Sequence, residues 1–278
     1  SGLREEEKRV QSNAVGSGNS HMMAYPRLSN SHCVTVLVVL GMFIIGAASS
    51  SMNAQTNVSG LVSSSTTWTL ANSPYIVTGN VLVNNGVTLT IEPGVTVKFD
   101  TLKALQINGQ LTARGNIGKS ITFTSSKPVP KAGDWGYIFF SNSSADASFD
   151  ANGNYARGSI LEYCIVEYAG NGATNRGAVE MTSSYPFINY CTIRSNSKSG
   201  IYASGLTDSL RITNNTIVNN TTQYAPQENG GGGGISASGG TVIISNNSIR
   251  NNSSTSAGNG GGIYVSSGTA IITGNTIS

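Results

Sequence analysis

The feature that most constrains this chain is an internal repeat in its second half. Five segments align residue by residue: ILEYCIV, FINYCTI, LRITNNTI, VIISNNSI and AIITGNTI. Two apolar columns run through them, namely Leu161, Ile188, Ile212, Ile244 and Ile272, and Val166, Ile193, Ile217, Ile249 and Ile277. A third column precedes the segments and consists of Val179, Ile201, Ile235 and Ile263. A constant core with variable gaps predicts a solenoid whose coils carry loop insertions.

One coil of such a repeat cannot bury its own apolar side chains. Stacked coils share the columns, and each short strand pairs with the coils on either side at about 4.8 Å. We therefore predict an all-β fold, a parallel β-helix with about three short strands per coil, over residues 68–278. Ile212, Ile244 and Ile272 are expected to stack at the coil spacing.

A small or polar residue separates the two apolar columns of each segment. These residues are Cys164, Cys191, Asn215, Asn247 and Asn275. An inward asparagine can bond its amide to the asparagine of the next coil and its oxygen to backbone N–H groups, which predicts a structural ladder. A second predicted ladder consists of Asn196, Asn220 and Asn252. Because several of these residues lie in N-x-S/T sequons, an alternative role is glycan attachment.

Two cysteines occupy the same ladder position on consecutive coils. Cys164 and Cys191 could form a disulfide, because stacked positions lie near the short end of the permitted Cα separation. They could equally be buried thiols that pack as small hydrophobic groups. The sequence leaves both possibilities open.

The first half shows short alternating segments without a recognisable helix. Each segment has apolar residues at every second position and is bounded by Gly, Asn, Asp or Pro, as strands and turns require. The whole chain has 34 Gly and only 10% charged residues. This composition disfavours a helical protein, whose exposed faces carry more charge.

The N-terminal region is predicted to hold processing signals. Residues 1–22 join no later pattern and are interpreted as a cloning remnant or an upstream leader. Residues 23–54 resemble a signal peptide, with Arg27 before the apolar run Val34–Ala48 and small residues after it. An uncleaved membrane anchor is the alternative, although the run is shorter than the roughly 20 residues that span a bilayer. Residues 55–67 are Ser/Thr-rich and are interpreted as a linker or an extended lead-in.

The end of the sequence interrupts a coil. Ser278 directly follows Ile277 of the last aligned segment. The expectation is that the β-helix is truncated there, and that the natural protein continues with more coils or an anchoring domain.

The repeat I-x-x-N-x-I with Gly-Ile before it resembles the right-handed parallel β-helix repeat family, which shares the pectate-lyase-like fold. The stretches SPYIVTGNVLVNNGVTLTIEPGVTVKF and GDWGYIFF are similar to a module of secreted and cell-surface bacterial proteins. The resemblance covers residues 68–278 and implies a right-handed solenoid. It says less about activity, because this fold hosts lyases, hydrolases, epimerases and adhesins.

Charge and histidine content narrow the possible chemistry. The net charge is +3, and no basic stripe is present, so no nucleic-acid partner is expected. Both histidines, His21 and His32, precede residue 55. Residues 55–278 therefore lack Ser-His-Asp triads and His-ligated metal sites.

Three carboxylates are the best candidates for an enzymatic site. Glu162, Glu167 and Glu180 fall on consecutive strands, and a polysaccharide lyase, hydrolase or epimerase would need such acids. The simpler interpretation is a solvated face on which Glu167 forms an exposed ion pair with Arg194. Acids and carbonyls of Asp134–Tyr137 and of the stretch Ser141–Arg157 could hold Ca²⁺. Their spacing matches no complete EF-type loop, which favours a plain surface loop. No other cofactor or metal is expected.

The preferred functional hypothesis is a secreted or cell-surface structural and binding module that contacts glycans or other surface polymers. Insertions at 169–176, 197–199, 221–233 and 253–261 are predicted to emerge along one edge. Tyr202, Tyr224 and Tyr264 are the candidate ligand-binding residues, since their rings could stack on sugars. Alternatively, these tyrosines only stiffen the outer sheet. Membrane contact is expected only through the signal peptide or a missing C-terminal anchor.

Overall fold

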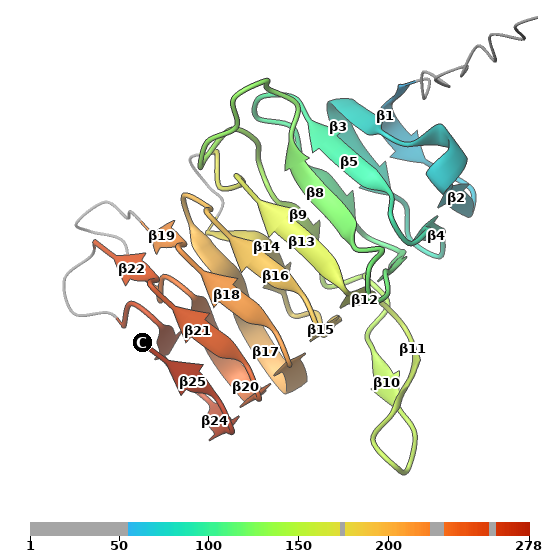
Figure 1. The fold of residues 1–278 in the computed structure, drawn as a ribbon. Coiled ribbons are helices and arrows are strands. Elements are labelled where there is room, and N and C mark those ends of the chain that lie inside the picture. The colour runs from blue at the N-terminus through green and yellow to red at the C-terminus, as the bar shows by residue number, and fades with distance from the viewer. Residues whose placement is uncertain (1–54, 173–175, 223–230, 256–259) are drawn as a thin grey trace, which may run out of the picture. The chain divides into compact units, whose positions relative to one another are not determined.

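The computed structural model describes residues 55–172, 176–222, 231–255 and 260–278. The predicted leader 1–22 and the signal peptide 23–54 lie outside the described residues. The described chain winds into a solenoid of short parallel strands that belong to one 21-stranded sheet (Figure 1). Each coil has three sides, here called faces A, B and C in chain order.

Face A carries the strands that lead into the repeat segments. It consists of β2 (Thr66–Trp68), β4 (Thr88–Ile91), β7 (Gln110–Arg114), β12 (Ile160–Glu162), β15 (Phe187–Asn189), β24 (Thr269–Thr273) and the second halves of β17 (Ser199–Thr213) and β20 (Ile235–Ser245). Face B consists of β5 (Thr96–Phe99), β8 (Ile121–Ser125), β13 (Cys164–Glu167), β16 (Thr192–Arg194), β18 (Thr216–Val218), β21 (Ser248–Arg250), β25 (Thr276–Ile277) and the first parts of β1 (Thr56–Val62) and β3 (Tyr75–Val83).

Face C closes each coil. It consists of β6 (Leu105–Ile107), β9 (Ile138–Phe140), β14 (Gly177–Thr182), β23 (Ile263–Val265), the second parts of β1 and β3 and the first halves of β17 and β20. Four short strands lie outside the faces: β10 (Ser148–Phe149) with β11 (Tyr155–Arg157), and β19 (Thr221–Thr222) with β22 (Ser253–Ser254). One 3-10 turn, η1 (Leu70–Asn72), follows β2.

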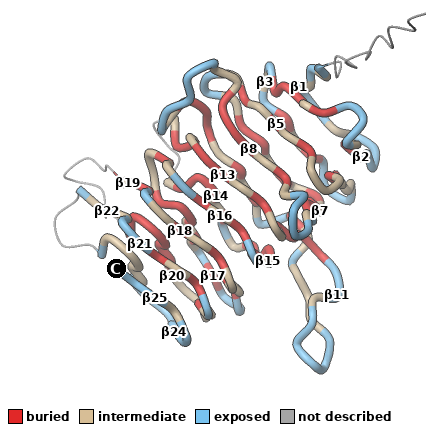
Figure 2. The backbone as a smooth tube through the Cα atoms, in the orientation of Figure 1, coloured by how far each residue is buried: buried red, intermediate tan, exposed pale blue. Residues whose placement is uncertain are grey.

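The strand register confirms the predicted columns and three strands per coil. Ile188 pairs with Ile212, which pairs with Ile244, which pairs with Ile272. The columns that contain Ile217 and Ile235 are in register in the same way. Inward residues along the strands are buried and alternate with more exposed ones (Figure 2). The period-2 pattern of the sequence therefore sets which side chains enter the core.

The segment 55–67 is part of the solenoid, so of the two interpretations the extended lead-in holds and the linker does not. Within it, β1 pairs in parallel with β3, and β2 pairs with β4. Trp68 at the end of β2 is buried and stacks on Tyr75, with ring centroids 4.9 Å apart. Serine and threonine are common in this segment because their alternate positions face outward on a strand.

Both asparagine series form hydrogen-bonded ladders inside the turns. Asn247 Oδ1 accepts from the N–H and the Nδ2 of Asn215, at 2.8 and 3.0 Å, and Asn275 does the same for Asn247. Asn252 Oδ1 receives the equivalent pair of bonds from Asn220. Asn220, which begins the sequon Asn-Thr-Thr, is buried with its amide engaged, and this disfavours it as a glycan acceptor.

Cys164 and Cys191 are both free and buried. Their Sγ atoms donate to carbonyl oxygens of the preceding coil, that of Ala113 at 3.4 Å and that of Leu161 at 3.3 Å. Burial, and then the neighbouring Cys191 thiol, raises the pKa of Cys164. Of the two possibilities left by the sequence, the structure shows packed thiols.

Insertions leave the solenoid at two corners. The predicted insertions follow a face B strand and precede a face C strand, so their described parts emerge along one edge, as expected. The excursion after β9 leaves at a different corner, between faces C and A. It is not a plain loop but the antiparallel β10–β11 hairpin, which projects beside β12 and β15 (Figure 1).

Candidate functional site

A row of polar side chains crosses the outer side of face A. Strand pairing aligns Arg114, Glu162, Asn189, Thr213 and Ser245 on five consecutive coils. At about 4.8 Å per coil, the row extends for about 19 Å along the solenoid. These positions point outward because each lies next to an inward residue of an apolar column.

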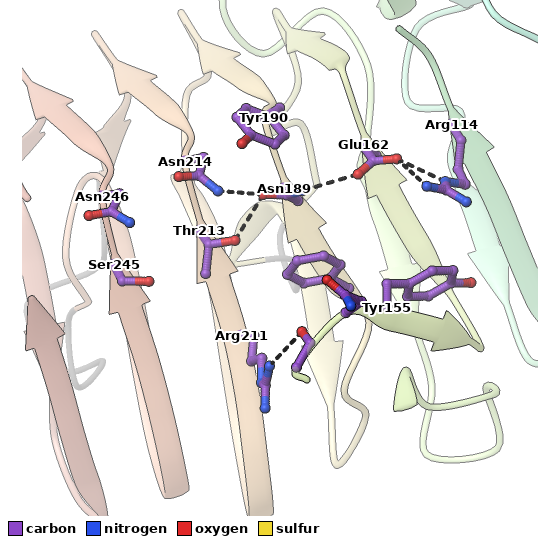
Figure 3. Close-up of a pocket in the computed structure, with 13 residues that line it drawn as sticks. Arg114, Tyr155, Glu162, Asn189, Tyr190, Arg211, Thr213, Asn214, Ser245 and Asn246 are labelled. Atoms are coloured by element: carbon purple, nitrogen blue, oxygen red, sulfur yellow. Dashed lines mark hydrogen bonds and ion pairs between the residues drawn. The ribbon is translucent and has the colours of Figure 1, made fainter. Parts of the chain in front are cut away.

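Hydrogen bonds connect the first four members of this row, from Arg114 to Thr213, from coil to coil (Figure 3). Glu162 accepts from Arg114 Nε at 2.8 Å and from Asn189 Nδ2 at 3.1 Å. Asn189 Oδ1 in turn accepts from the Thr213 hydroxyl and from Asn214 Nδ2, both at 2.9 Å. The network fixes the side chains in position, so a ligand would meet a preorganised surface.

The hairpin forms one wall beside this row. The Phe149 and Phe187 rings meet edge to face at 5.0 Å, and the Tyr155 ring stacks over Phe187 at 6.2 Å. The Arg211 guanidinium lies 3.8 Å from the Phe149 ring centroid. At the base of the hairpin, Gly158 has φ +100° and packs against the Asp146 backbone, where a Cβ would collide. Aromatic and cation–π contacts therefore hold the hairpin against face A.

Turn residues form the opposite wall. Tyr163, Tyr190, Asn214 and Asn246 follow the polar row and all have positive φ, and the last three line the groove. The Tyr163 and Tyr190 rings stack in parallel at 4.9 Å, and Tyr190 remains 47% exposed. Asparagine tolerates this left-handed conformation well, whereas tyrosine adopts it less often. The stacking of the two rings across coils offsets part of that cost.

Between the two walls lies a groove of about 490 Å³ (Figure 3). Its lining combines aromatic rings with amide, hydroxyl, carboxylate and guanidinium groups. A sugar presents an apolar C–H face to rings and hydroxyls to hydrogen-bonding groups, so this lining suits a carbohydrate. Burial raises the pKa of Tyr155, and its hydroxyl donates to Gly158 O at 2.6 Å.

The three candidate carboxylates do not form one site. Only Glu162 lines the groove, on face A. Glu167 lies at the end of face B strand β13 and forms an ion pair with Arg194 at 2.7 Å. The Glu167 side chain is 11% exposed and that of Arg194 is 47% exposed, so the predicted pair exists with only its arginine largely in solvent. Glu180 lies on face C, where burial raises its pKa although the Arg176 N–H donates to it. The three carboxylates therefore lie on three different faces of the solenoid.

Of the candidate tyrosines, two share a second pocket. Tyr202 and Tyr264 line a space of about 360 Å³ on the outer side of face C. Tyr224 lies outside the described residues.

The acids proposed for Ca²⁺ binding are each engaged separately. Asp150 caps the hairpin turn by accepting from Asn152 and Asn154. Asp146 accepts from the Tyr185 N–H, and Asp134 binds Lys127. Among the described residues there is no group of three or more His, Cys, Asp or Glu side chains that could hold a metal ion. In the same part of the chain, no helix has the length and hydrophobicity needed to cross a membrane.

Sequence reasoning missed the groove. Arg114, Tyr155, Asn189 and Tyr190 were not singled out, although Asn189 and Tyr190 stand inside an aligned repeat segment. The available signal was the outward position two residues before each ladder residue, which is polar in every segment. The hairpin wall had only a weak signal, because Phe149 and Tyr155 flank an Asp-Ala-Asn-Gly-Asn turn.

Comparisons with known proteins agree with this fold. A family described as right handed beta helix region matches residues 137–277, just over half of the chain, so the chain belongs to this family. This assigns the right-handed sense to the solenoid. A stretch of 53 residues, 19% of the chain, is 45% identical to Protein bark beetle of Drosophila melanogaster and covers 2% of that protein's length. No solved structure matches.

Proposed function

We propose that this β-helix module binds a carbohydrate polymer along the groove on face A, in a secreted or cell-surface setting. The observation that carries the proposal is the groove itself. A row of polar side chains extends over five coils between an aromatic hairpin and a column of turn residues, and hydrogen bonds fix its members on the first four coils. A polymer that lies along the solenoid axis would meet similar groups at each coil spacing.

The enzymatic alternative needs a second acid in the same groove. A glycosidase places two carboxyl groups on either side of the scissile bond. Among the described lining residues, Glu162 is the one carboxylate, and Arg114 holds it in an ion pair at 2.8 Å. This arrangement supports binding more directly than bond cleavage.

The proposal can be tested with variants that preserve the backbone conformation. Tyr190→Asn introduces the residue type found at the same left-handed position in the next two coils, and removes an exposed ring. Asn246→Gly keeps the positive φ and removes an amide from the groove. The matched control is Asn251→Gly, at an exposed left-handed turn of the same coil but on another corner.

Binding of cellohexaose, chitohexaose and hexagalacturonate to the full chain would be measured by calorimetry. We expect both groove variants to lower the affinity for the best-bound ligand about fivefold or more, since a stacked ring contributes about 1 kcal/mol. Asn251→Gly should bind as the parent does. Unchanged binding in both groove variants would contradict the proposal that the groove is the binding site. Release of shortened or unsaturated products would favour the enzymatic alternative.

A further inference from the structure

A column of large outward side chains on face C is interrupted at one coil. Strand pairing aligns Phe139, Glu180, Tyr202, Ser236 and Tyr264 on consecutive coils. Serine therefore stands where its neighbours on both sides are tyrosines. The gap above Ser236 is the second pocket, with a volume of about 360 Å³.

The dimensions of this gap match one flat ring. Tyr202 and Tyr264 are two coils apart, which corresponds to about 10 Å between their backbones. A ring placed midway would lie about 5 Å from each tyrosine, within the range of favourable stacking. The molecule already contains such an arrangement, because the Tyr163 and Tyr190 rings stack in parallel at 4.9 Å across one coil.

The floor and sides of the gap are polar. Ser236, Ser238 and Ser266 line it, and none of their hydroxyls has a hydrogen-bond partner among the described residues. Arg176 stands at one side, where its Nη1 donates to the Tyr202 hydroxyl at 3.3 Å and its guanidinium lies 5.7 Å from the ring centroid. This contact fixes the Tyr202 ring as one wall of the gap.

We infer that the gap between Tyr202 and Tyr264 is a binding slot for a single pyranose ring of a glycan. A pyranose has two faces with C–H groups that stack on aromatic rings, and a rim of hydroxyls that bond to serine hydroxyls. An aromatic side chain could stack between the two tyrosines but would make no hydrogen bonds to the three serine hydroxyls. The combination of aromatic walls and a hydroxyl floor therefore selects a sugar.

The slot is separate from the groove on face A. The two sites share no lining residue, and they lie on different faces of the coil. The slot would hold one sugar unit between two rings, whereas the groove would contact a chain over several coils. A substitution that abolishes binding at one site is therefore not expected to affect binding at the other.

Filling the slot provides the sharpest test. Ser236→Tyr places a third tyrosine between the two existing rings and occupies the space of the ligand. The matched control, Ser248→Tyr, makes the same substitution at an outward position of the same coil on face B. A second variant, Tyr264→Ser, removes one wall without adding volume, in case the filled slot disturbs folding. Thermal unfolding of each variant would check that the solenoid is retained.

The probes are cellohexaose, chitohexaose and hexagalacturonate, observed by saturation-transfer NMR with irradiation of the aromatic protons. We expect transfer to pyranose ring protons in the parent chain and in Tyr190→Asn. Ser236→Tyr and Tyr264→Ser should weaken this binding about tenfold or more, and Ser248→Tyr should leave it unchanged. The proposal is overturned if no probe binds the parent, if Ser236→Tyr binds as tightly as the parent, or if the control loses binding equally.

Discussion

The two halves of the solenoid fill the same interior column in different ways. Along face B, strand pairing and the repeat place seven residues at one position of successive coils: Val95, Ile121, Cys164, Cys191, Asn215, Asn247 and Asn275. The column is apolar in the first half, polar in the second, and occupied by thiols where the halves meet. The backbone path is the same throughout, so either chemistry can close the turn.

The difference shows what a buried polar group requires in a repeat protein. Val95 and Ile121 are fully buried and need no partner. An inner ladder asparagine bonds both a backbone carbonyl and the asparagine of the next coil, as Asn215 Nδ2 does with Ile188 O and Asn247 Oδ1. A buried amide without such partners would leave donors and an acceptor unpaired. The two cysteines make the transition possible, since a thiol packs as a small apolar group and demands little hydrogen bonding.

The largest effect is expected from placing an isolated amide in the apolar half. Ile121→Asn removes a fully buried side chain and introduces an amide that has no asparagine on either adjacent coil. We expect a loss of about 4 kcal/mol in the free energy of unfolding, from lost apolar burial together with unpaired polar groups. Denaturant unfolding of the full chain would measure it, with Ile121→Val as the control for small volume changes. A loss below about 1 kcal/mol would mean that this position accepts an isolated amide as readily as an apolar side chain.

The reverse change should be somewhat less costly. Asn247→Val leaves the Asn215 N–H and Nδ2 without their shared acceptor. We expect a loss of about 3 kcal/mol, because two buried donors become unpaired while an apolar side chain is gained. Hydrogen exchange at the Asn215 amide would report the lost bond directly. Continued protection of that amide would contradict the ladder interpretation.

A substitution at the junction should be nearly neutral. Cys191→Asn would extend the ladder by one coil, because Asn215 Oδ1 already accepts from the Cys191 N–H at 2.8 Å. The added Nδ2 could reach the Asn215 oxygen in the geometry of the other rungs. We expect a change below about 1 kcal/mol, in contrast to Ile121→Asn at the same column. A loss as large as that of Ile121→Asn would show that the neighbouring asparagine is not what makes the amide tolerable.

The smallest effect concerns the pH dependence of stability. It compares Asp134, a charged residue outside the ladder, with the uncharged ladder residue Asn247. Burial favours a higher pKa for Asp134, but hydrogen bonds from Lys127, the Lys131 N–H and the Ser125 hydroxyl outweigh it and lower the pKa. A lowered folded-state pKa contributes stability above the unfolded value of about 3.9, and this stability is lost as pH falls through the folded value. In Asp134→Asn, the free energy of unfolding should therefore fall less steeply as the pH is lowered below about 4. In Asn247→Val, it should be lower by the same amount at every pH. An unchanged acid limb in Asp134→Asn would contradict this role.

Much of the fold follows from local pattern. The alternation of apolar residues places side chains inward or outward, and the repeat aligns equal positions on successive coils. Ile212, Ile244 and Ile272 are in register for this reason, and the asparagine ladders follow from the same alignment. The linker prediction for 55–67 failed because the Ser/Thr composition of an outward strand face resembles that of a linker.

The candidate site was mostly beyond reach of the sequence. The polar row on face A could have been found from the repeat, but the groove also needs the hairpin wall. Phe149 contacts Phe187 and Arg211, which are distant in sequence, and nothing local indicates where the hairpin folds. Likewise, Glu162, Glu167 and Glu180 are close in sequence yet face different sides, because each coil turns two corners between them.

The sequence by itself determined the solenoid, its three strands per coil and the residues that enter its core. These depend on short-range periodicity, which every coil repeats. Tertiary structure alone decided that Cys164 and Cys191 remain thiols and that the β10–β11 hairpin lies against face A. Those features depend on contacts between side chains of different coils, and their geometry is set only when the coils stack.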